Sequence, residues 1–516
     1  MVIGFPQPAL RIASLVWLLL GTGSLIVAAE DPSSSVAAAR QFRIVLDPAL
    51  ACEPRSGRLF VFTTQRSSRE PRFGPNWFSP EPFCGRDVAT FRPGQTETLA
   101  EGADAFPGNL STWAAGAYRV QAVFDTSLDN NDPGGAPGNY YSDVVPLDVS
   151  ADRGFVCDLR LQHLVPERSP PARGDQQEVI YRSDQLSKFF GRDVVEHCVV
   201  LLPGSYGAPS SEKRYPTVYV IPGFGGDHWQ AAAFGRRLLT LGTEGREFIV
   251  VGLSGNCRWG HHVYANSATN GPRGESLVQE LIPLIDARFR TLGEPAARFV
   301  TGHSSGGWAS LWLQVTYPET FGGCWSLSPD PVDFRDFQQI DLYANPPLSL
   351  YFDEQGAPRP VARRGEHAAL WFPGFGRMDD VLGRGGQLRS FEAVFSPLDV
   401  QGLPRRLWDR ETGRIDPETA HAWEAYDIRL KLEREWHRIE PLLRRKLHIV
   451  TGELDTFYLE GAVRRLQQTL QKLGSDAEVE IIPGRDHGSV LTQSLFAKIH
   501  RQMWEAHRHV GTVGSL

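Results

Sequence analysis

The chain has 516 residues, which is enough for two or three domains of ordinary size. Its composition, with 41% hydrophobic and 22% charged residues, is that of a globular protein. The formal net charge of −7 comes from 60 acidic and 53 basic residues, so we expect neither a basic surface nor a nucleic-acid partner.

The first 29 residues have the pattern of an export signal. Arg11 is a basic flank, an apolar run covers 15–27, and the small residues Val27, Ala28 and Ala29 fit a cleavage site before residue 30. The apolar run is short for a bilayer span, and polar residues follow it at once. We therefore predict a signal peptide at 1–29, no stable membrane insertion, and a secreted or periplasmic protein.

The six cysteines do not form a C-x-x-C pair, so we expect no zinc or redox centre and no other metal site. An exported protein can oxidise some of its cysteines. Cys52 and Cys84 are the candidate pair, because both lie in polar loops of one N-terminal region.

Residues 30–165 show the alternation of apolar and polar residues that is typical of β-strands. Turn-rich loops separate the alternating stretches, which lie at 41–46, 58–62, 118–124, 142–149 and 155–164. We predict an N-terminal antiparallel β-sandwich with no chemistry of its own. Its acidic, glycine-rich segment 125–139 fits no EF-hand spacing, which favours a solvated loop over a calcium site.

A Pro-, Arg- and Ser-rich linker at 166–177 leads to a second domain at 178–516. There, strands alternate with helices, which predicts a mostly parallel sheet covered by helices. The expected strands are 194–202, 217–221, 248–253, 446–451 and 478–482, and the expected helices are 229–241, 276–289, 459–473 and 494–507. A less regular segment at about 330–440, with a short strand at 348–352 and a helix at 417–443, is predicted to be an insertion that caps the site.

The segment 298–307 combines a strand with a G-x-S-x-G motif, Gly302 to Gly306, and a helix follows at 308–317. This context predicts a nucleophile elbow, in which Ser304 is the nucleophile and small residues stand two positions to either side. Ser305 is the alternative nucleophile, but the residue two before it is His303 and not glycine. We therefore expect Ser305 to contribute only its backbone N–H, as a donor to the oxyanion. A plain glycine-rich turn is the alternative interpretation.

A glycine-rich loop at 222–226 follows the strand that ends at residue 221. Glycines allow a backbone N–H to approach a substrate carbonyl oxygen, and this is where an α/β-hydrolase places part of its oxyanion hole. The predicted donors are the N–H groups of Phe224 and Ser305. In isolation the loop is equally compatible with an ordinary turn.

A serine hydroxyl needs a base, and a histidine base needs a carboxylate that fixes its tautomer. Asp455 and His487 each follow a predicted strand, and the order Ser304, Asp455, His487 is that of an α/β-hydrolase. Glu453 is the alternative carboxylate. Asp455 could instead cap a helix, and His487 could be an ordinary loop histidine. We expect His303 to point away from the base.

Residues 180–505 resemble the esterase D family of α/β-hydrolases, which includes S-formylglutathione hydrolases, enterochelin-type esterases, feruloyl esterases and mycolyl transferases. The resemblance rests on the motifs at 219–226, 302–307, 452–455 and 486–488, and on the loop 266–274. It implies an α/β-hydrolase fold with Ser304 as nucleophile, Asp455 as acid, His487 as base, and the N–H groups of Phe224 and Ser305 as oxyanion hole. Pro222 stands where relatives often carry histidine.

Together these features predict an α/β-hydrolase domain with an N-terminal β-sandwich, acting as a secreted serine carboxylester hydrolase without a cofactor. The expected partner is a small-molecule or polymer-linked ester, such as an aryl, siderophore or simple acyl ester. An acyltransferase with the same triad and a catalytically inactive polymer-binding protein are the alternatives. The sequence leaves the oligomeric state open.

Overall fold

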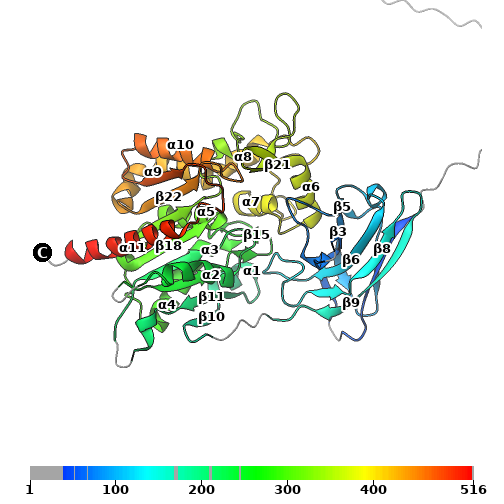
Figure 1. Ribbon diagram of the computed structural model, residues 1–516, viewed down its shortest axis with the longest axis horizontal. Helices are drawn as coiled ribbons and strands as arrows, with labels where there is room; N and C mark the ends of the chain where they lie inside the picture. The colour runs from blue at the N-terminus through cyan, green and yellow to red at the C-terminus, as the bar shows by residue number, and fades with distance from the viewer. Residues whose placement is uncertain are drawn as a thin grey trace, which may run out of the picture.

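The computed structural model describes residues 39–50, 53–66, 68–167, 173–208, 212–242 and 246–513, with side chains to residue 508. The predicted signal peptide, Cys52 and residues 168–172 of the predicted linker lie outside these ranges, so the Cys52–Cys84 pairing stays a prediction. Figure 1 shows two bodies in contact, a β-rich N-terminal domain and a larger domain of strands and helices. Among the described helices, none has the length and apolarity needed to cross a bilayer.

Nine strands form the N-terminal domain, and a single hydrogen-bonded path joins them in the order β4-β1-β9-β7-β6-β2-β3-β5, with β8 beside β6. The pair β1–β9 is parallel and the other pairs are antiparallel. The expected strand-rich domain is present, but it is not purely antiparallel. The strands are β1 (Arg40–Leu46), β2 (Arg55–Thr64), β3 (Phe83–Phe91), β4 (Thr96–Leu99), β5 (Asp104–Phe106), β6 (Gly116–Asp125), β7 (Tyr140–Ser142), β8 (Val145–Val149) and β9 (Phe155–Leu164).

Strand β2 is buried on both faces, because it separates two hydrophobic cores. Leu59 and Val61 belong to the core of the N-terminal domain. Phe60 and Phe62, which point to the opposite face, belong to the large core that is otherwise built by the second domain. The N-terminal domain therefore contributes part of one of its sheet faces to the main core of the protein.

Polar contacts fix the same interface around helix α6 (Phe372–Leu382). The buried guanidinium of Arg58 donates to the carbonyl oxygen of Val381 at 2.8 Å and pairs with Asp104. In the opposite direction, Arg377 of α6 donates to the carbonyl oxygen of Ala105 at 3.1 Å. A further contact comes from the acidic segment 125–139, where Asp129 pairs with Arg192 of the second domain. The N-terminal domain thus contacts α6 near its C-terminus, through Arg58, and along its side, through Arg377.

The second domain has an eight-stranded sheet in the order β10-β11-β13-β12-β18-β19-β22-β23. Strand β11 is antiparallel to both neighbours, and the other five pairs are parallel. This topology confirms the predicted α/β-hydrolase fold. The strands are β10 (Gln176–Arg182), β11 (Val195–Leu201), β12 (Thr217–Ile221), β13 (Ile249–Leu253), β18 (Arg298–His303), β19 (Gly323–Leu327), β22 (Leu447–Gly452) and β23 (Glu478–Ile482).

Helices cover both faces of this sheet, as its apolar residues require. On one face, α2 (His228–Leu239) and α11 (Gln493–Val513) share a core with Val218 and Val220. On the other, α4 (Ile282–Arg288), α5 (Ser305–Thr316) and α10 (Glu460–Lys472) share a core with Tyr219 and Ile221. Alternate residues of β12 therefore serve different cores. The helix expected at 276–289 is interrupted by a π-helical turn, Leu277–Leu281.

The segment between β19 and β22 corresponds to the region that we predict to be an insertion. It contains β20 (Pro360–Arg364), β21 (His367–Trp371), α6, α7 (Gln387–Phe395), α8 (Pro417–Trp423) and α9 (Ile428–Leu443). Figure 1 shows α6 and α7 lying between the two domains. The single helix expected at 417–443 is divided, because Asp427 caps the N-terminus of α9 by accepting the N–H of Leu430. The expected strand at 348–352 is irregular.

Removal of the buried hydrogen bond from Arg58 to Val381 should measurably lower the stability of the protein. Arg58→Ala should lower the free energy of unfolding by about 1–3 kcal/mol, because it leaves the buried Val381 carbonyl without its donor. The control is Arg43→Ala, which removes the exposed pair with Asp158 and should cost less than about 1 kcal/mol. Urea denaturation of both variants checks this, and equal costs would contradict the role given to Arg58.

Candidate active site

Ser304 lies in the sharp turn between strand β18 and helix α5. Its backbone has φ 61° and ψ −125°, a conformation that is strained for any residue other than glycine. The N–H of Ser304 donates to the carbonyl oxygen of Leu327 in the neighbouring strand β19, at 2.9 Å. The strand, turn and helix are those expected of a nucleophile elbow, and they project the Ser304 side chain at the carboxyl edge of the sheet.

Close backbone contacts explain the glycines on either side of Ser304. A Cβ on Gly302 would lie 2.3 Å from the carbonyl oxygen of Gly306, and a Cβ on Gly306 would lie 2.1 Å from that of Ile221. Neither distance is possible for a real side chain. The turn, the first turn of α5 and the end of β12 are therefore packed backbone against backbone.

The glycine-rich loop after β12 lies directly beside the elbow. A Cβ on Gly223 would be 3.4 Å from that of Ser304, and the loop closes through a hydrogen bond from the N–H of Gly226 to the carbonyl oxygen of Gly223, at 3.0 Å. This places Phe224 next to the nucleophile, while Ser305 begins helix α5 with its dipole directed at the same point. The arrangement suits the predicted oxyanion donors, the N–H groups of Phe224 and Ser305.

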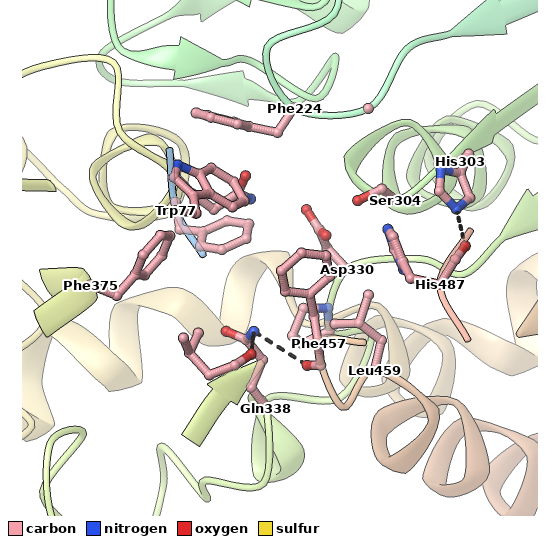
Figure 2. Close-up of a pocket in the computed structure, with 15 residues that line it drawn as sticks. Trp77, Phe224, His303, Ser304, Asp330, Gln338, Phe375, Phe457, Leu459 and His487 are labelled. Carbon is pink, nitrogen blue, oxygen red and sulfur yellow. Dashed lines mark hydrogen bonds between the residues drawn. The ribbon is translucent and has the colours of Figure 1, made fainter. Parts of the chain in front are cut away.

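The other two members of the predicted triad are paired with each other. Nδ1 of His487 lies 2.8 Å from Oδ2 of Asp455, which is fully buried, and Oδ1 of Asp455 accepts the N–H of Phe457 at 2.9 Å. Because Nδ1 is engaged, Nε2 is the nitrogen left to accept a proton. Figure 2 shows the His487 ring beside Ser304. The rival Glu453 instead accepts the N–H of Gly484.

His303 does not point away from the base, so that expectation was wrong. Its ring centroid lies 4.4 Å from that of His487, and its Nε2 lies 2.8 Å from the carbonyl oxygen of His487. Burial lowers the pKa of His303 to about 3, with the nearby His487 acting in the same direction. His303 is therefore a neutral imidazole, and its N–H holds the loop that carries the base.

Sequence reasoning missed a second carboxylate at the site, that of Asp330. It follows strand β19, which is parallel to the elbow strand, and it is 6% exposed. Its Oδ2 accepts the hydroxyl of Ser305 at 2.6 Å, and its N–H donates to the carbonyl oxygen of Ser304 at 3.3 Å. The available signal was an acidic residue three positions after the mostly apolar stretch 323–327.

Ser304, His487 and Asp330 open into one cavity of about 260 Å³. Most of its other walls are apolar, and they come from the glycine loop, the insertion and the N-terminal domain: Trp77, Phe224, Pro331, Val361, Phe375, Phe391, Phe457 and Leu459. Trp77 lies in the segment between β2 and β3, and Figure 2 shows it facing the catalytic side chains across the cavity. The N-terminal domain thus supplies part of the pocket, which the sequence did not predict.

One group of side chains in the described ranges has the make-up of a metal site, and it lies outside this pocket. Oε1 of Glu178 is 3.1 Å from Nδ1 of His197 and 3.1 Å from Nε2 of His228. These contacts are also those of a carboxylate that accepts two imidazole N–H groups, which accounts for the cluster without an ion. We therefore assign no ion to this cluster.

A family model described as "Putative esterase" matches residues 187–504, which is more than half of the chain. The chain belongs to this family. The match covers the elbow, the glycine loop and the residues of the predicted triad, and it confirms the resemblance to esterases that the motifs predicted. It also supports the expected enzyme class, that of carboxylic ester hydrolases.

Curated relatives match this esterase-family protein over limited lengths. Esterase Rv1288 of Mycobacterium tuberculosis is 34% identical over 152 residues, which is 28% of this chain and 32% of that protein. An endo-1,4-beta-xylanase/feruloyl esterase of Xylanibacter ruminicola is 27% identical over 207 residues, which is 38% of this chain and 26% of that protein. The chain therefore matches a third or less of the length of each relative.

Solved structures are similar at low sequence identity. The serine hydrolase FphF of Staphylococcus aureus is 14% identical with a TM-score of 0.40, covering 64% of this chain and 98% of that one. An S-formylglutathione hydrolase from Agrobacterium tumefaciens is 15% identical with a TM-score of 0.39, covering 66% of this chain and 98% of that one.

The environment of His487 predicts the acid side of the pH profile. Burial lowers the pKa of His487, but the charge and hydrogen bond of Asp455 outweigh it, with help from Asp330 and Asp486, so that the pKa lies above its ordinary 6.5. A base must be neutral to accept a proton, so kcat/KM should fall as the pH drops through a midpoint above 6.5. Ester hydrolysis measured from pH 5 to 9 checks this. A plateau that persists below pH 6 would contradict it.

Proposed function

We propose that this protein is a secreted serine carboxylester hydrolase that works through an acyl-enzyme on Ser304. One observation carries the proposal: Ser304, on a strained elbow, faces the same cavity as a histidine whose Nδ1 is held by a buried aspartate. A family match to esterases supports the reaction class. Export rests on the predicted signal peptide at 1–29.

In the proposed mechanism, Ser304 Oγ attacks the ester carbonyl carbon while Nε2 of His487 takes the hydroxyl proton. Asp455 keeps the proton of His487 on Nδ1 and stabilises the imidazolium that forms. The N–H groups of Phe224 and Ser305 receive the negative charge of the tetrahedral intermediate. His487 then protonates the leaving alkoxide, and a water molecule, activated by the same histidine, releases the acyl group from Ser304.

The pocket favours compact groups among the candidate substrates. A cavity of about 260 Å³ lies just below the usual range for ligand sites, so it suits an aryl or short acyl group better than a whole siderophore. Aromatic walls favour a flat group through stacking. Trp77 is part of this aromatic wall, since its ring centroid lies 5.7 Å from that of Phe224 and 5.1 Å from that of Phe375.

The first test compares two serine variants. Ser304→Ala should lower kcat for short-chain nitrophenyl esters by at least roughly 10³-fold, and should abolish covalent labelling by a fluorophosphonate. Ser305→Ala keeps the backbone N–H and should still be labelled. Labelling that is lost in Ser305→Ala but retained in Ser304→Ala would overturn the assignment. A wild-type protein that neither turns over nor labels would favour the inactive polymer-binding alternative.

The second test concerns the contribution of the N-terminal domain to specificity. Trp77→Ala should lower kcat/KM for an aryl-acyl ester by about 10-fold or more relative to the acetyl ester, because it removes one aromatic wall of the pocket. Trp371→Ala is the matched control, since Trp371 is 43% exposed on β21 and does not line the pocket. Equal losses for both esters in Trp77→Ala would show that Trp77 does not contact the substrate.

A further inference from the structure

The carboxylate of Asp330 is not a member of the triad, although its charge helps to raise the pKa of His487, and it projects into the pocket. Figure 2 shows it in the space between Ser304 and the aromatic side chains of Trp77, Phe224 and Phe457. Its hydrogen bond from the Ser305 hydroxyl accounts for one of its two oxygens. The structural role that this bond gives Asp330 would be filled equally well by the amide oxygen of an asparagine.

The charge of Asp330 is the unusual feature. Burial raises the pKa of Asp330 to about 6, although the Ser305 hydroxyl, the charge of His487 and the Ser304 hydroxyl each act to lower it. The group is therefore an anion at pH 8. Among the described residues that line the pocket, none is a lysine or an arginine. The pocket therefore carries a buried negative charge without a fixed cation in its walls.

A fixed anion at this position opposes the reaction of a neutral ester. Charge develops on the carbonyl oxygen in the transition state, and a neighbouring carboxylate repels it more strongly in a low-dielectric pocket than in water. Asp455 already stabilises the imidazolium of His487, so that role does not require a second carboxylate. A substrate that brings its own positive charge would remove the repulsion.

The remaining walls suit such a charge. The faces of aromatic rings attract ammonium groups, and a cage of several rings is a common way to bind them. Trp77 packs with Phe224, Phe375 and Phe457 at centroid separations of 5.7, 5.1 and 6.2 Å, so these rings form a continuous cluster. All four line the cavity that contains Asp330.

We propose that the pocket selects esters whose acyl or alcohol group carries an ammonium, held between the Asp330 carboxylate and the aromatic side chains of Trp77, Phe224 and Phe457. The proposal rests on the proposed esterase function and names the substrate class of that same site. Asp330 is then a specificity-determining residue, and esters that carry a carboxylate are disfavoured.

Two matched substrate pairs test the proposal at pH 8, where Asp330 is ionised. The pair that varies the alcohol is acetylcholine and 3,3-dimethylbutyl acetate. The pair that varies the acyl group is the nitrophenyl esters of 4-(trimethylammonio)butanoate and 5,5-dimethylhexanoate. In each pair a charged nitrogen replaces a carbon of the same shape. We expect the cationic member of at least one pair to have a kcat/KM about 10-fold higher or more, and Asp330→Asn to bring that ratio close to 1.

Glu354→Gln is the matched control, because it removes a charge from an exposed residue that does not line the pocket, and it should leave the ratio unchanged. A purely structural role of Asp330 would lower both members of a pair equally. A test on the wild type alone guards against misfolding of Asp330→Asn: phenyltrimethylammonium should inhibit hydrolysis of a neutral ester more strongly than its neutral isostere, tert-butylbenzene.

Hydrolysis of the neutral esters with no preference for a cation in either pair would overturn this proposal and leave the esterase function standing. A preference that survives in Asp330→Asn would also overturn it. Failure of the esterase function itself has a different signature, because Ser304 would then not react with a fluorophosphonate and all four esters would stay intact.

Discussion

The active site depends on the backbone packing around Ser304. The positive φ of this residue is maintained because the first turn of α5 lies against the end of β12, with room for no side chain at Gly302 or Gly306. The same packing sets Gly223 against Ser304, so the oxyanion loop and the nucleophile are positioned by one contact. The two strands that flank β18, β12 and β19, hold the strained turn in its conformation, and the loop itself does not.

A second constraint joins the two domains into one catalytic unit. The outer face of β2 and the side of α6 share a core, and Arg58 and Arg377 bond across it in opposite directions. This contact holds the segment with Trp77 over the pocket. The N-terminal domain therefore forms part of the pocket, and the volume and aromatic character of the pocket depend on it.

Local sequence patterns were sufficient to predict the positions of the site residues that follow strands. Ser304, Asp455 and His487 each stand at the carboxyl end of a strand that the apolar pattern predicts, and parallel strands bring such positions to one edge. Six of the eight strands of this sheet, all but β10 and β19, and most of its helices were predictable for the same reason. Boundaries such as the break at Asp427 were not, because the capping side chain competes with an otherwise continuous helical pattern.

The residues that shape the pocket had no comparable local signal. Trp77 lies in an irregular segment more than 200 residues from Ser304, and only the packing of β2 on α6 brings it to the site. His303 was misplaced because the elbow turns its ring toward the base loop and not away from it. Asp330 follows a strand, β19, that was not recognised, so its position at the catalytic edge of the sheet was missed.

The central claim is that one pocket, built by both domains, delivers an ester to Ser304. A crystal structure of the protein after reaction with an aryl phosphonate tests it most directly. The account predicts phosphorus bonded to Ser304 Oγ, a phosphoryl oxygen within hydrogen-bond distance of the N–H groups of Phe224 and Ser305, and the organic group in contact with Trp77. An adduct on another residue, or an organic group directed away from Trp77 and the N-terminal domain, would contradict it.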